Sequence, residues 1–454
     1  MNYKVILAAS IDELINLGQD YIKELIEIPR DKAFGDYSFP CYKVINKIGK
    51  SPALIAKEIK SGFRNEFFEK IEISGGYLNF YINKNILMNA IIDNILSEGE
   101  LYGTSNEGIG KKVYINQFLS KATKESKENY FFSEIIKNSL CNIFKSQGYE
   151  VNSENFLENC KSSASCRYNE NCDNIMESLD KAKNNLLNKR TENIAEEIIK
   201  RKDVKNINCT KVIDLRDYNM SPFIIKNISD ELSLEAIMLS KLLYEKEILN
   251  FDKCVIIGRK DDNIYFKKLC KALNIIKMEL GKASLEYASL GIVKFENGID
   301  YKLLKGKIIF SCMKDSREKN KVILWNNIMN FNYESHLCVE EVYIKGIKVL
   351  RESKQINFST QIPNSIDMYS RELIEILGEF NKEILYALDT LEPYIIVRYV
   401  IDFAKAFNKF YSFNVSLEGE EVLCEPHVIK IIKASTIVLE NAMKLIGVQT
   451  IEEI

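Results

Sequence analysis

Short apolar segments alternate with helical patterns through the middle of the sequence, and this rhythm constrains the fold more than any other feature. The strand-like segments are 112–116, 211–215 and 254–258, and the intervening helical patterns include 133–146 and 264–273. Segment 254–258, CVIIG, is apolar throughout, as a strand is when both of its faces are buried. Strand–helix–strand order of this kind predicts an α/β domain with a doubly wound parallel sheet over residues 109–330.

The residues before this domain are expected to form a separate unit, 1–108. Helical patterns cover 11–28, 53–68 and 86–97. The alternation in 76–82 predicts a strand with Leu78, Phe80 and Ile82 on one face. Glycines and acidic residues at 103–110 are typical of a linker.

The last section, 331–454, is almost purely helical in pattern. Segments 393–411 and 428–446 each carry a broad apolar face. An all-α bundle is the simplest arrangement that buries two such faces. The sequence therefore predicts three domains, 1–108, 109–330 and 331–454, in an α/β plus α architecture.

Composition excludes several classes of protein. No stretch of about 18 apolar residues is free of charge, so no membrane span is expected. Eleven cysteines without a CxxC pair are typical of reduced thiols in a cytoplasmic protein. A net charge of −2 means that any RNA contact depends on local basic patches.

The positions of the histidines and cysteines also limit where metal binding or imidazole catalysis can occur. The two histidines, His336 and His427, both lie in the last third, so the first 335 residues offer no imidazole as acid, base or ligand. Cys160, Cys166 and Cys172 are regularly spaced, but the spacing is not a zinc pattern and no histidine is nearby. No metal site is expected.

Both ends of the chain resemble arginyl-tRNA synthetases, through the runs 28–60, 75–84 and 391–417. The matching N-terminal positions are a Gly-Asp turn, a helix start and a tRNA-facing strand: Gly35, Asp36, Pro52, Ile55, Ala56, Gly76, Asn79 and Phe80. The matching C-terminal positions are Glu392, Pro393, Arg398, Tyr399, Phe407, Asn408, Phe410 and Tyr411. The resemblance implies an N-terminal tRNA-binding domain, a class I Rossmann-like catalytic-type domain and a helical anticodon-binding bundle.

The middle domain resembles the family in its framework but departs from it at signature positions. Class I synthetases stabilise charge on the phosphates of ATP with a HIGH-type motif and a KMSKS-type mobile loop. Lys127, Glu128, Asn129 and Tyr130 stand where the first motif is expected. In the loop segment, Lys305 and Gly306 match the family, while Tyr301, Lys302, Leu303 and Leu304 replace its core.

The amino-acid pocket departs as well. The family's Tyr-Ala-Thr-Arg-Asp run corresponds to 234–238, its Gln-x-x-His to 262–265, and its Gly-Asp-Trp to 158–160. The chain between Cys160 and Lys211 is also shorter than the usual insert of the family. Five departures at one active site, within a retained framework, indicate lost chemistry.

Candidate site residues follow from the resemblance, each beside a plain alternative. The tRNA-contact candidates are Asn79, Phe80, Tyr81, Arg398, Lys405, Asn408, Lys409 and Tyr411; the alternatives are an ordinary strand face and a solvated helix face. Pocket remnants are Ser120, Lys124 and Gly258, where the glycine could equally serve a tight turn. The degraded signature positions are Lys127, Asn129, Tyr130, Lys302 and Lys305.

The expected function is an arginyl-tRNA synthetase-like protein that binds tRNA and is impaired in ATP-dependent arginylation. It is expected to be a monomer with no permanently bound cofactor, needing arginine, ATP and Mg²⁺ only if activity is retained. Two alternatives stay open. One is a working arginine–tRNA ligase in which Lys127 and Lys302 replace the missing donors, and the other is a protein-interaction scaffold.

Overall fold

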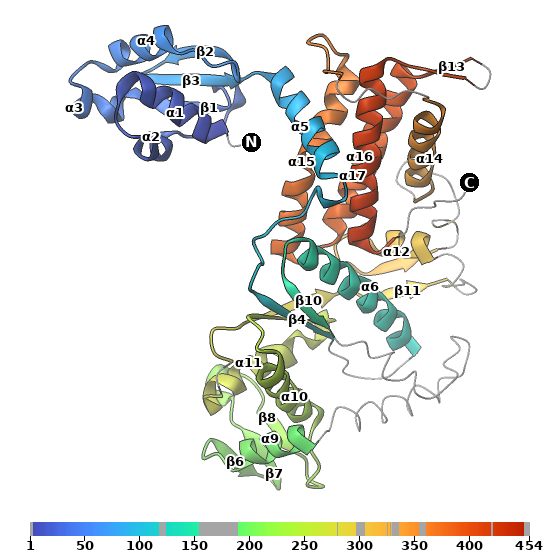
Figure 1. Ribbon diagram of the computed structural model, residues 1–454. Coiled ribbons are helices and arrows are strands. Elements are labelled where there is room, and N and C mark those ends of the chain that lie inside the picture. Colours follow the sequence, from blue (N-terminus) through green and yellow to red (C-terminus); the bar gives the residue numbers. More distant parts are fainter. Residues whose placement is uncertain are drawn as a thin grey trace. The chain divides into compact units, whose positions relative to one another are not determined.

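The computed structural model describes residues 3–117, 124–153, 189–278, 280–296, 305–324, 326, 328, 336–353, 360–418 and 421–448 (Figure 1). The chain divides into two compact units. Unit 1 comprises Met1–Gly99, Lys348–Gly378 and Lys409–Ile437. Unit 2 comprises Glu100–Ile347, Glu379–Asn408 and Val438–Ile454. No helix among the described residues is long and apolar enough to cross a membrane.

The N-terminal part of unit 1 is a three-stranded antiparallel sheet covered by helices (Figure 1). Its strands are β1 (Tyr37–Pro40), β2 (Phe68–Ser74) and β3 (Tyr77–Ile82), in the order β1-β3-β2. The helices are α1 (Tyr3–Ile15), α2 (Gln19–Leu25), α3 (Ile45–Ile48) and α4 (Pro52–Gly62), followed after the sheet by α5 (Lys84–Glu98). Ser51 begins α4 by accepting a hydrogen bond from the backbone N of Leu54, with Pro52 in the first turn.

Two expected helices are wrong in extent. The helix expected over 11–28 is interrupted between α1 and α2, where Asn16 and Gly18 have φ of 49° and 93°. The Asp12 carboxylate stabilises this break by accepting hydrogen bonds from the backbone N atoms of Leu17 and Gly18. The helix expected over 53–68 ends at Gly62, and Phe68 instead begins β2.

A Gly-Asp turn fixes the edge of the N-terminal sheet. The backbone N of Asp36 donates to the Phe80 carbonyl at 2.9 Å, and the Asp36 carboxylate accepts from the backbone N of Ile82 at 2.8 Å. Gly35 has φ of +91°, and a Cβ there would lie 2.8 Å from the Phe80 carbonyl oxygen. Both the dihedral angle and the close approach therefore require glycine.

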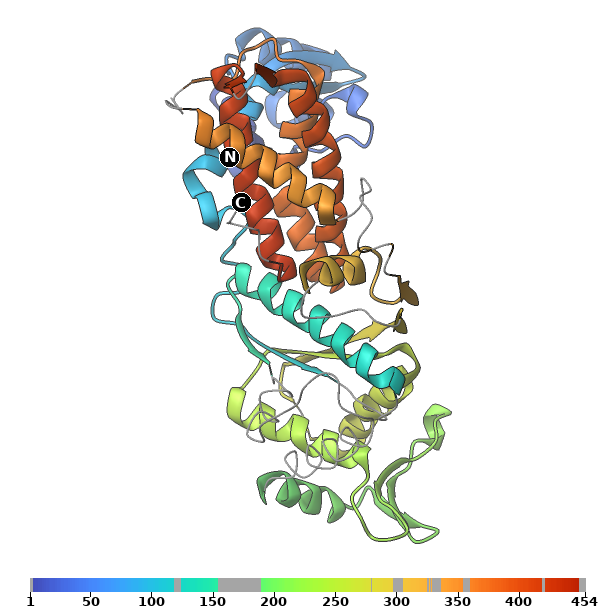
Figure 2. The same ribbon diagram turned by 90° about the vertical axis from the view of Figure 1, so that its right-hand side faces the viewer.

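A four-stranded parallel sheet forms the core of unit 2. Its strands are β4 (Lys112–Gln117), β5 (Glu150–Ser153), β9 (Lys253–Arg259) and β10 (Ser284–Leu290), in the order β10-β9-β4-β5. The helices that accompany it are α6 (Lys124–Ser146), α10 (Leu234–Leu249) and α11 (Asn263–Ile276), with α6 running along the sheet (Figure 2). The predicted doubly wound parallel sheet is confirmed.

A second, antiparallel sheet lies in the same unit. It consists of β6 (Val204–Ile207), β7 (Thr210–Ile213) and β8 (Phe223–Lys226), preceded by α9 (Lys189–Ile199). The strand expected at 211–215 belongs here, so its assignment to the parallel sheet is wrong. The reason is local: Asn208 and Cys209, with φ of 49° and 61°, form a two-residue hairpin that pairs β7 with β6.

After the parallel sheet come β11 (Val293–Phe295), α12 (Lys305–Met313) and β12 (Lys321–Ile323), with β11 and β12 parallel. The remaining elements are mostly helical, as predicted: α14 (His336–Glu352), α15 (Met368–Thr390), α16 (Tyr394–Asn414) and α17 (Pro426–Ile446). One short hairpin, β13 (Ser416–Glu418) and β14 (Glu421–Leu423), is an addition that the helical pattern does not predict. The apolar faces of α16 and α17 are buried, including Ile396, Val400, Phe407, Ile431 and Val438.

We predict that Gly35→Ala destabilises the protein by about 3 kcal/mol, because it combines a strained left-handed conformation with a clash against a backbone carbonyl. Thermal unfolding by calorimetry measures the effect. The matched control is Gly49→Ala, where φ is +74° but no atom lies within 4 Å of the added Cβ. An equal loss in both variants would mean that the approach to Phe80 contributes nothing.

Candidate functional site

The carboxyl ends of the parallel strands meet at one edge of the unit 2 sheet. In doubly wound sheets, ligands bind outside this edge, at the point where the strand order reverses. The order β10-β9-β4-β5 reverses between β4 and β9, which places the candidate position beside Gln117 and Gly258. Gly258 lies within β9, buried and in register with Ser289 of β10, so it is a strand residue at this edge and not part of a tight turn.

The signature positions on α6 make internal contacts. Asn129 is buried, and its Oδ1 accepts a hydrogen bond from the backbone N of Val293 at 3.0 Å. The Tyr130 hydroxyl donates to Oε1 of Glu134 at 3.0 Å, and the buried Lys137 ammonium donates to the same oxygen at 2.7 Å. Asn129 therefore ties α6 to β11, and Tyr130 is tied to the next turn of its own helix.

Several expected site residues fall outside the described part of the chain: Ser120, Lys302, and the side chains of Lys124, Lys127 and Lys305. The cysteines Cys160, Cys166 and Cys172 fall outside it as well. Among the residues that are described, no group of three His, Cys, Asp or Glu side chains is placed to hold a metal ion. The segment that resembles the end of the mobile loop is helical, because α12 begins at Lys305.

A buried ion pair joins the segment that corresponds to the Tyr-Ala-Thr-Arg-Asp run to α11, three residues beyond the segment that corresponds to Gln-x-x-His. Lys268 Nζ lies 2.9 Å from Oε1 of Glu235, with side chains 6% and 16% exposed. The other carboxylate oxygen of Glu235 accepts a hydrogen bond from the backbone N of Ile224 at 3.2 Å. Glu235 lies in the first turn of α10 and Lys268 in the second turn of α11, which follows β9, so the pair lies toward the carboxyl edge of the sheet.

Sequence reasoning did not find this pair. The two residues are 33 positions apart, on different helices, and Lys268 belongs to none of the expected motifs. The available signal was weak: Glu235 falls within the expected pocket run, but a charged residue in the first turn of a helix is ordinary. Lys268 also stands over the ring of Tyr265, with Nζ 5.7 Å from the ring centroid.

The N-terminal tRNA-contact candidates are largely internal. Phe80 is fully buried and packs against Phe63 and Phe68, so the expectation that its ring contacts tRNA is wrong. Asn79 is also buried, and its Oδ1 accepts a hydrogen bond from the Ser38 hydroxyl at 2.7 Å. As consecutive residues of a strand, Asn79 and Phe80 point to opposite faces of the sheet, and both are buried on the central strand, β3.

Tyr81 is the exception among these three residues. It is partly exposed, and its hydroxyl oxygen lies 2.8 Å from both the Ala33 carbonyl oxygen and a Glu72 carboxylate oxygen, which share its single O–H donor. The hydrogen bond to Glu72, followed by burial, raises the pKa of Tyr81. Its ring lies 4.8 Å from the Lys70 ammonium, so an aromatic and a basic side chain lie together on this face.

Arg398, Lys405 and Lys409 share one face of α16, because steps of seven and four residues return to nearly the same helical angle. Arg398 and Lys409 are exposed, and Lys405 is half-buried. Lys409 pairs with Glu372 at 3.1 Å. This basic face is the strongest candidate for an RNA contact on α16.

Asn408 and Tyr411 lie on other faces of α16. Asn408 Oδ1 accepts a hydrogen bond from Lys345 at 2.9 Å, and its amide lies 3.6 Å from the Cys338 sulfur, so Asn408 joins α16 to α14. Tyr411 is half-buried, and burial together with nearby Glu352 raises the pKa of its hydroxyl. Neither residue extends the basic face.

Two family models match the chain. Residues 1–82 match the arginyl tRNA synthetase N terminal domain, and residues 339–454 match the DALR anticodon binding domain. The matched segments include the Gly35-Asp36 turn and the basic face of α16. The candidate RNA contacts at both ends therefore lie inside recognised domains.

Full-length relatives cover the middle as well. Arginine–tRNA ligases of Clostridium botulinum strain 657 and of Clostridium kluyveri are each 27% identical, over 564 and 571 positions, with all of both chains covered. The first alignment exceeds the 454 residues of this chain by 110 positions, so at least that many have no residue here.

Solved structures agree in fold. The arginyl-tRNA synthetases of Thermus thermophilus and Plasmodium falciparum superpose with TM-scores of 0.64 and 0.62 at 14% identity, covering all of this chain and 100% and 98% of theirs. Matches at both ends, relatives along the whole length and a shared fold lead to one conclusion: the chain belongs to the arginyl-tRNA synthetase family.

Proposed function

We propose that this protein binds tRNA and is impaired in, or has lost, ATP-dependent arginylation. The observation that carries the proposal is the hydrogen bond from the backbone of Val293 to Asn129 at 3.0 Å. Asn129 stands at the third position of the HIGH-type quartet, where the family has a glycine that lets adenine approach the backbone, and here a buried side chain occupies that position. The amide oxygen accepts from the backbone of Val293, so the side chain is held in place by a structural contact and fills space that a glycine would leave open.

The amino-acid side of the site supports the same proposal. The family's Tyr-Ala-Thr-Arg-Asp run ends in a carboxylate, and the corresponding residue here is Met238. Apolar side chains cannot pair with the guanidinium of arginine. The acidic residue that the run does contain, Glu235, is already paired with Lys268 and with the backbone of Ile224.

RNA binding rests on the retained ends. The N-terminal and anticodon-binding domains both match their family models, and α16 presents an exposed arginine and lysine on one face. Basic side chains on a helix supply the phosphate contacts that dominate RNA affinity. The proposal includes a monomer acting in the cytoplasm, with free buried thiols such as Cys254 and Cys312, and with no permanently bound cofactor.

We expect arginine-dependent ATP–pyrophosphate exchange to stay at background, with and without total tRNA. Removal of one transition-state donor typically costs about 100-fold or more, and several are replaced here. The control is an intact arginine–tRNA ligase in the same assay. Clear exchange by this protein would instead establish a working ligase with atypical signatures.

We expect purified tRNA to bind with a dissociation constant of about 10 μM or tighter at modest salt, and Arg398→Ala to weaken binding several-fold and lower the salt dependence by about one charge. Filter binding over a salt series measures both. The matched control is Lys382→Ala, an exposed lysine already paired with Glu379 at 2.5 Å. Absence of binding would leave the protein-interaction alternative.

We expect Lys268→Met to destabilise the protein by about 3–5 kcal/mol, because it leaves the buried Glu235 carboxylate without its cation. Adding Glu235→Gln should recover a large part of that loss, since the amide keeps an acceptor for Ile224. Urea unfolding of the two variants measures the difference. No recovery in the double variant would mean that Lys268 stabilises the protein through other contacts.

A further inference from the structure

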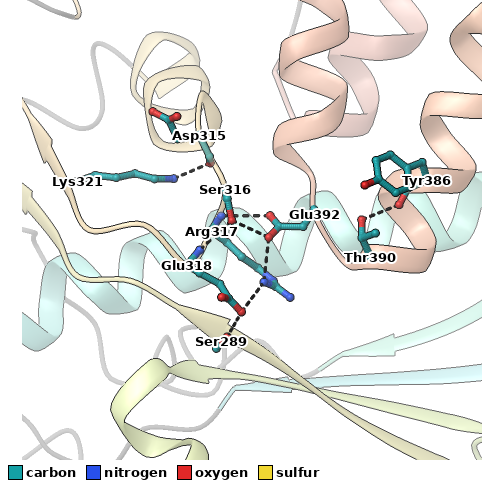
Figure 3. Close-up of polar contacts among 9 residues, drawn as sticks. All are labelled: Ser289, Asp315, Ser316, Arg317, Glu318, Lys321, Tyr386, Thr390 and Glu392. Atoms are coloured by element: carbon teal, nitrogen blue, oxygen red, sulfur yellow. Dashed lines mark hydrogen bonds and ion pairs between the residues drawn. The ribbon is translucent and has the colours of Figure 1, made fainter.

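A buried ion pair joins the start of α16 to the connection between α12 and β12 (Figure 3). Glu392, two residues before α16, accepts hydrogen bonds from the Ser316 hydroxyl at 2.8 Å and from Arg317 Nη1 at 3.1 Å. Its second oxygen accepts from the backbone N of Arg317 at 3.2 Å. The Arg317 and Glu392 side chains are 8% and 14% exposed, so little solvent screens the pair.

The same connection is held from the other side by the residues that end and follow β10. The backbone N of Gly291 donates to the Arg317 carbonyl at 2.8 Å, and the backbone N of Lys321 donates to the Ile292 carbonyl at 2.8 Å. A Cβ on Gly291 would lie 2.3 Å from the Lys319 carbonyl oxygen, so the two backbones touch directly. Residues 316–321 therefore cannot shift without moving the chain that leaves β10.

The side chains of Glu318 and Lys321 add further contacts to this connection. Glu318 accepts a hydrogen bond from the hydroxyl of Ser289, at the carboxyl edge of β10 (Figure 3). Lys321 donates to the carbonyls of Cys312 and Asp315, at the end of α12, at 2.5 and 2.9 Å. Consecutive polar contacts thus link the Glu392 carboxylate, beside α16, to three parts of unit 2. These are the end of α12, the connection 316–321 and the carboxyl edge of the parallel sheet.

We propose that Glu392 is a positioning residue through which RNA bound along α16 sets the geometry of the sheet edge at Ser289–Ile292. The proposal rests on the RNA-binding function proposed above. Arg398 lies one turn into α16, so a phosphate held there acts on the same end of the helix that carries Glu392. A shift of α16 must carry residues 316–318 along, because separating a buried carboxylate from its donors is costly.

The test is hydrogen–deuterium exchange of peptides covering 289–295 and 319–323, with and without total tRNA, in wild type and in Glu392→Gln. In wild type, RNA should slow exchange of both peptides. In Glu392→Gln, exchange without RNA should be about tenfold faster, because the backbone contacts lose their anchor. RNA should then give no protection, although the dissociation constant from filter binding changes less than about threefold, since the substitution removes no basic side chain.

Controls separate positioning from general damage. Glu379→Gln removes an exposed carboxylate paired with Lys382 and should leave both peptides unchanged. Peptides covering β6 and β7 serve as an internal reference. If Glu392→Gln does not fold, Ser316→Ala is the second variant. It removes the 2.8 Å hydrogen bond to Glu392 and the 3.4 Å one from the backbone N of Glu318, and it should shift both peptides in the same direction by a smaller factor.

The outcomes distinguish this proposal from the proposed function. If RNA at full occupancy still protects the two peptides in Glu392→Gln, the protection comes from direct contact and the inference is overturned. The inference is also overturned if RNA binds to wild type but does not slow exchange of either peptide. If RNA does not bind at all, the proposed function fails. The exchange rates without RNA then decide whether Glu392 holds the edge, and equal rates in wild type and variant would overturn that too.

Discussion

Burial of β9 on both faces is the constraint on which the parallel sheet of unit 2 depends. Cys254 through Gly258 are all buried, and β9 pairs in register with β4 on one side and β10 on the other. Around this strand, Phe251 stacks on Tyr114, and apolar residues of α10 and α11 complete a continuous core. Any side chain at the carboxyl edge is placed by this packing, whatever chemistry it carries.

That dependence explains how a synthetase framework can persist while its chemical positions change. The framework requires apolar volume in the right pattern, which many sequences satisfy. The chemical positions require particular donors at particular distances, and a buried polar residue there must find another partner. Asn129 accepts a hydrogen bond from the backbone N of Val293. Glu235 pairs with Lys268 and accepts a hydrogen bond from the backbone N of Ile224. These contacts give both residues a structural role.

The candidate RNA contacts at the two ends of the chain depend on backbone and helix geometry. The Gly-Asp turn at the N-terminal sheet is fixed by backbone geometry, and the aromatic Phe80 beside it belongs to the core. On α16 the exposed cations are spaced by whole turns along one face, so helical geometry alone brings them into line. Because the net charge of the protein is −2, any attraction of this face for RNA phosphates comes from the position of these few cations and not from the total charge.

The elements whose burial is periodic and local follow from the sequence alone. They are the apolar strand at 254–258, the helices near 86–97, 393–411 and 428–446, and the α/β rhythm of the middle of the chain. The sequence also determined the family, since the end motifs are contiguous. Strand pairing, by contrast, depends on the three-dimensional fold. Most of the segment 211–215 lies in β7, which pairs with β6 in an antiparallel sheet because the two-residue hairpin at Asn208 and Cys209 joins the two strands. The fold alone joined Glu235 to Lys268 and Arg317 to Glu392, since contacts between residues 33 and 75 positions apart leave no periodic trace in the chain.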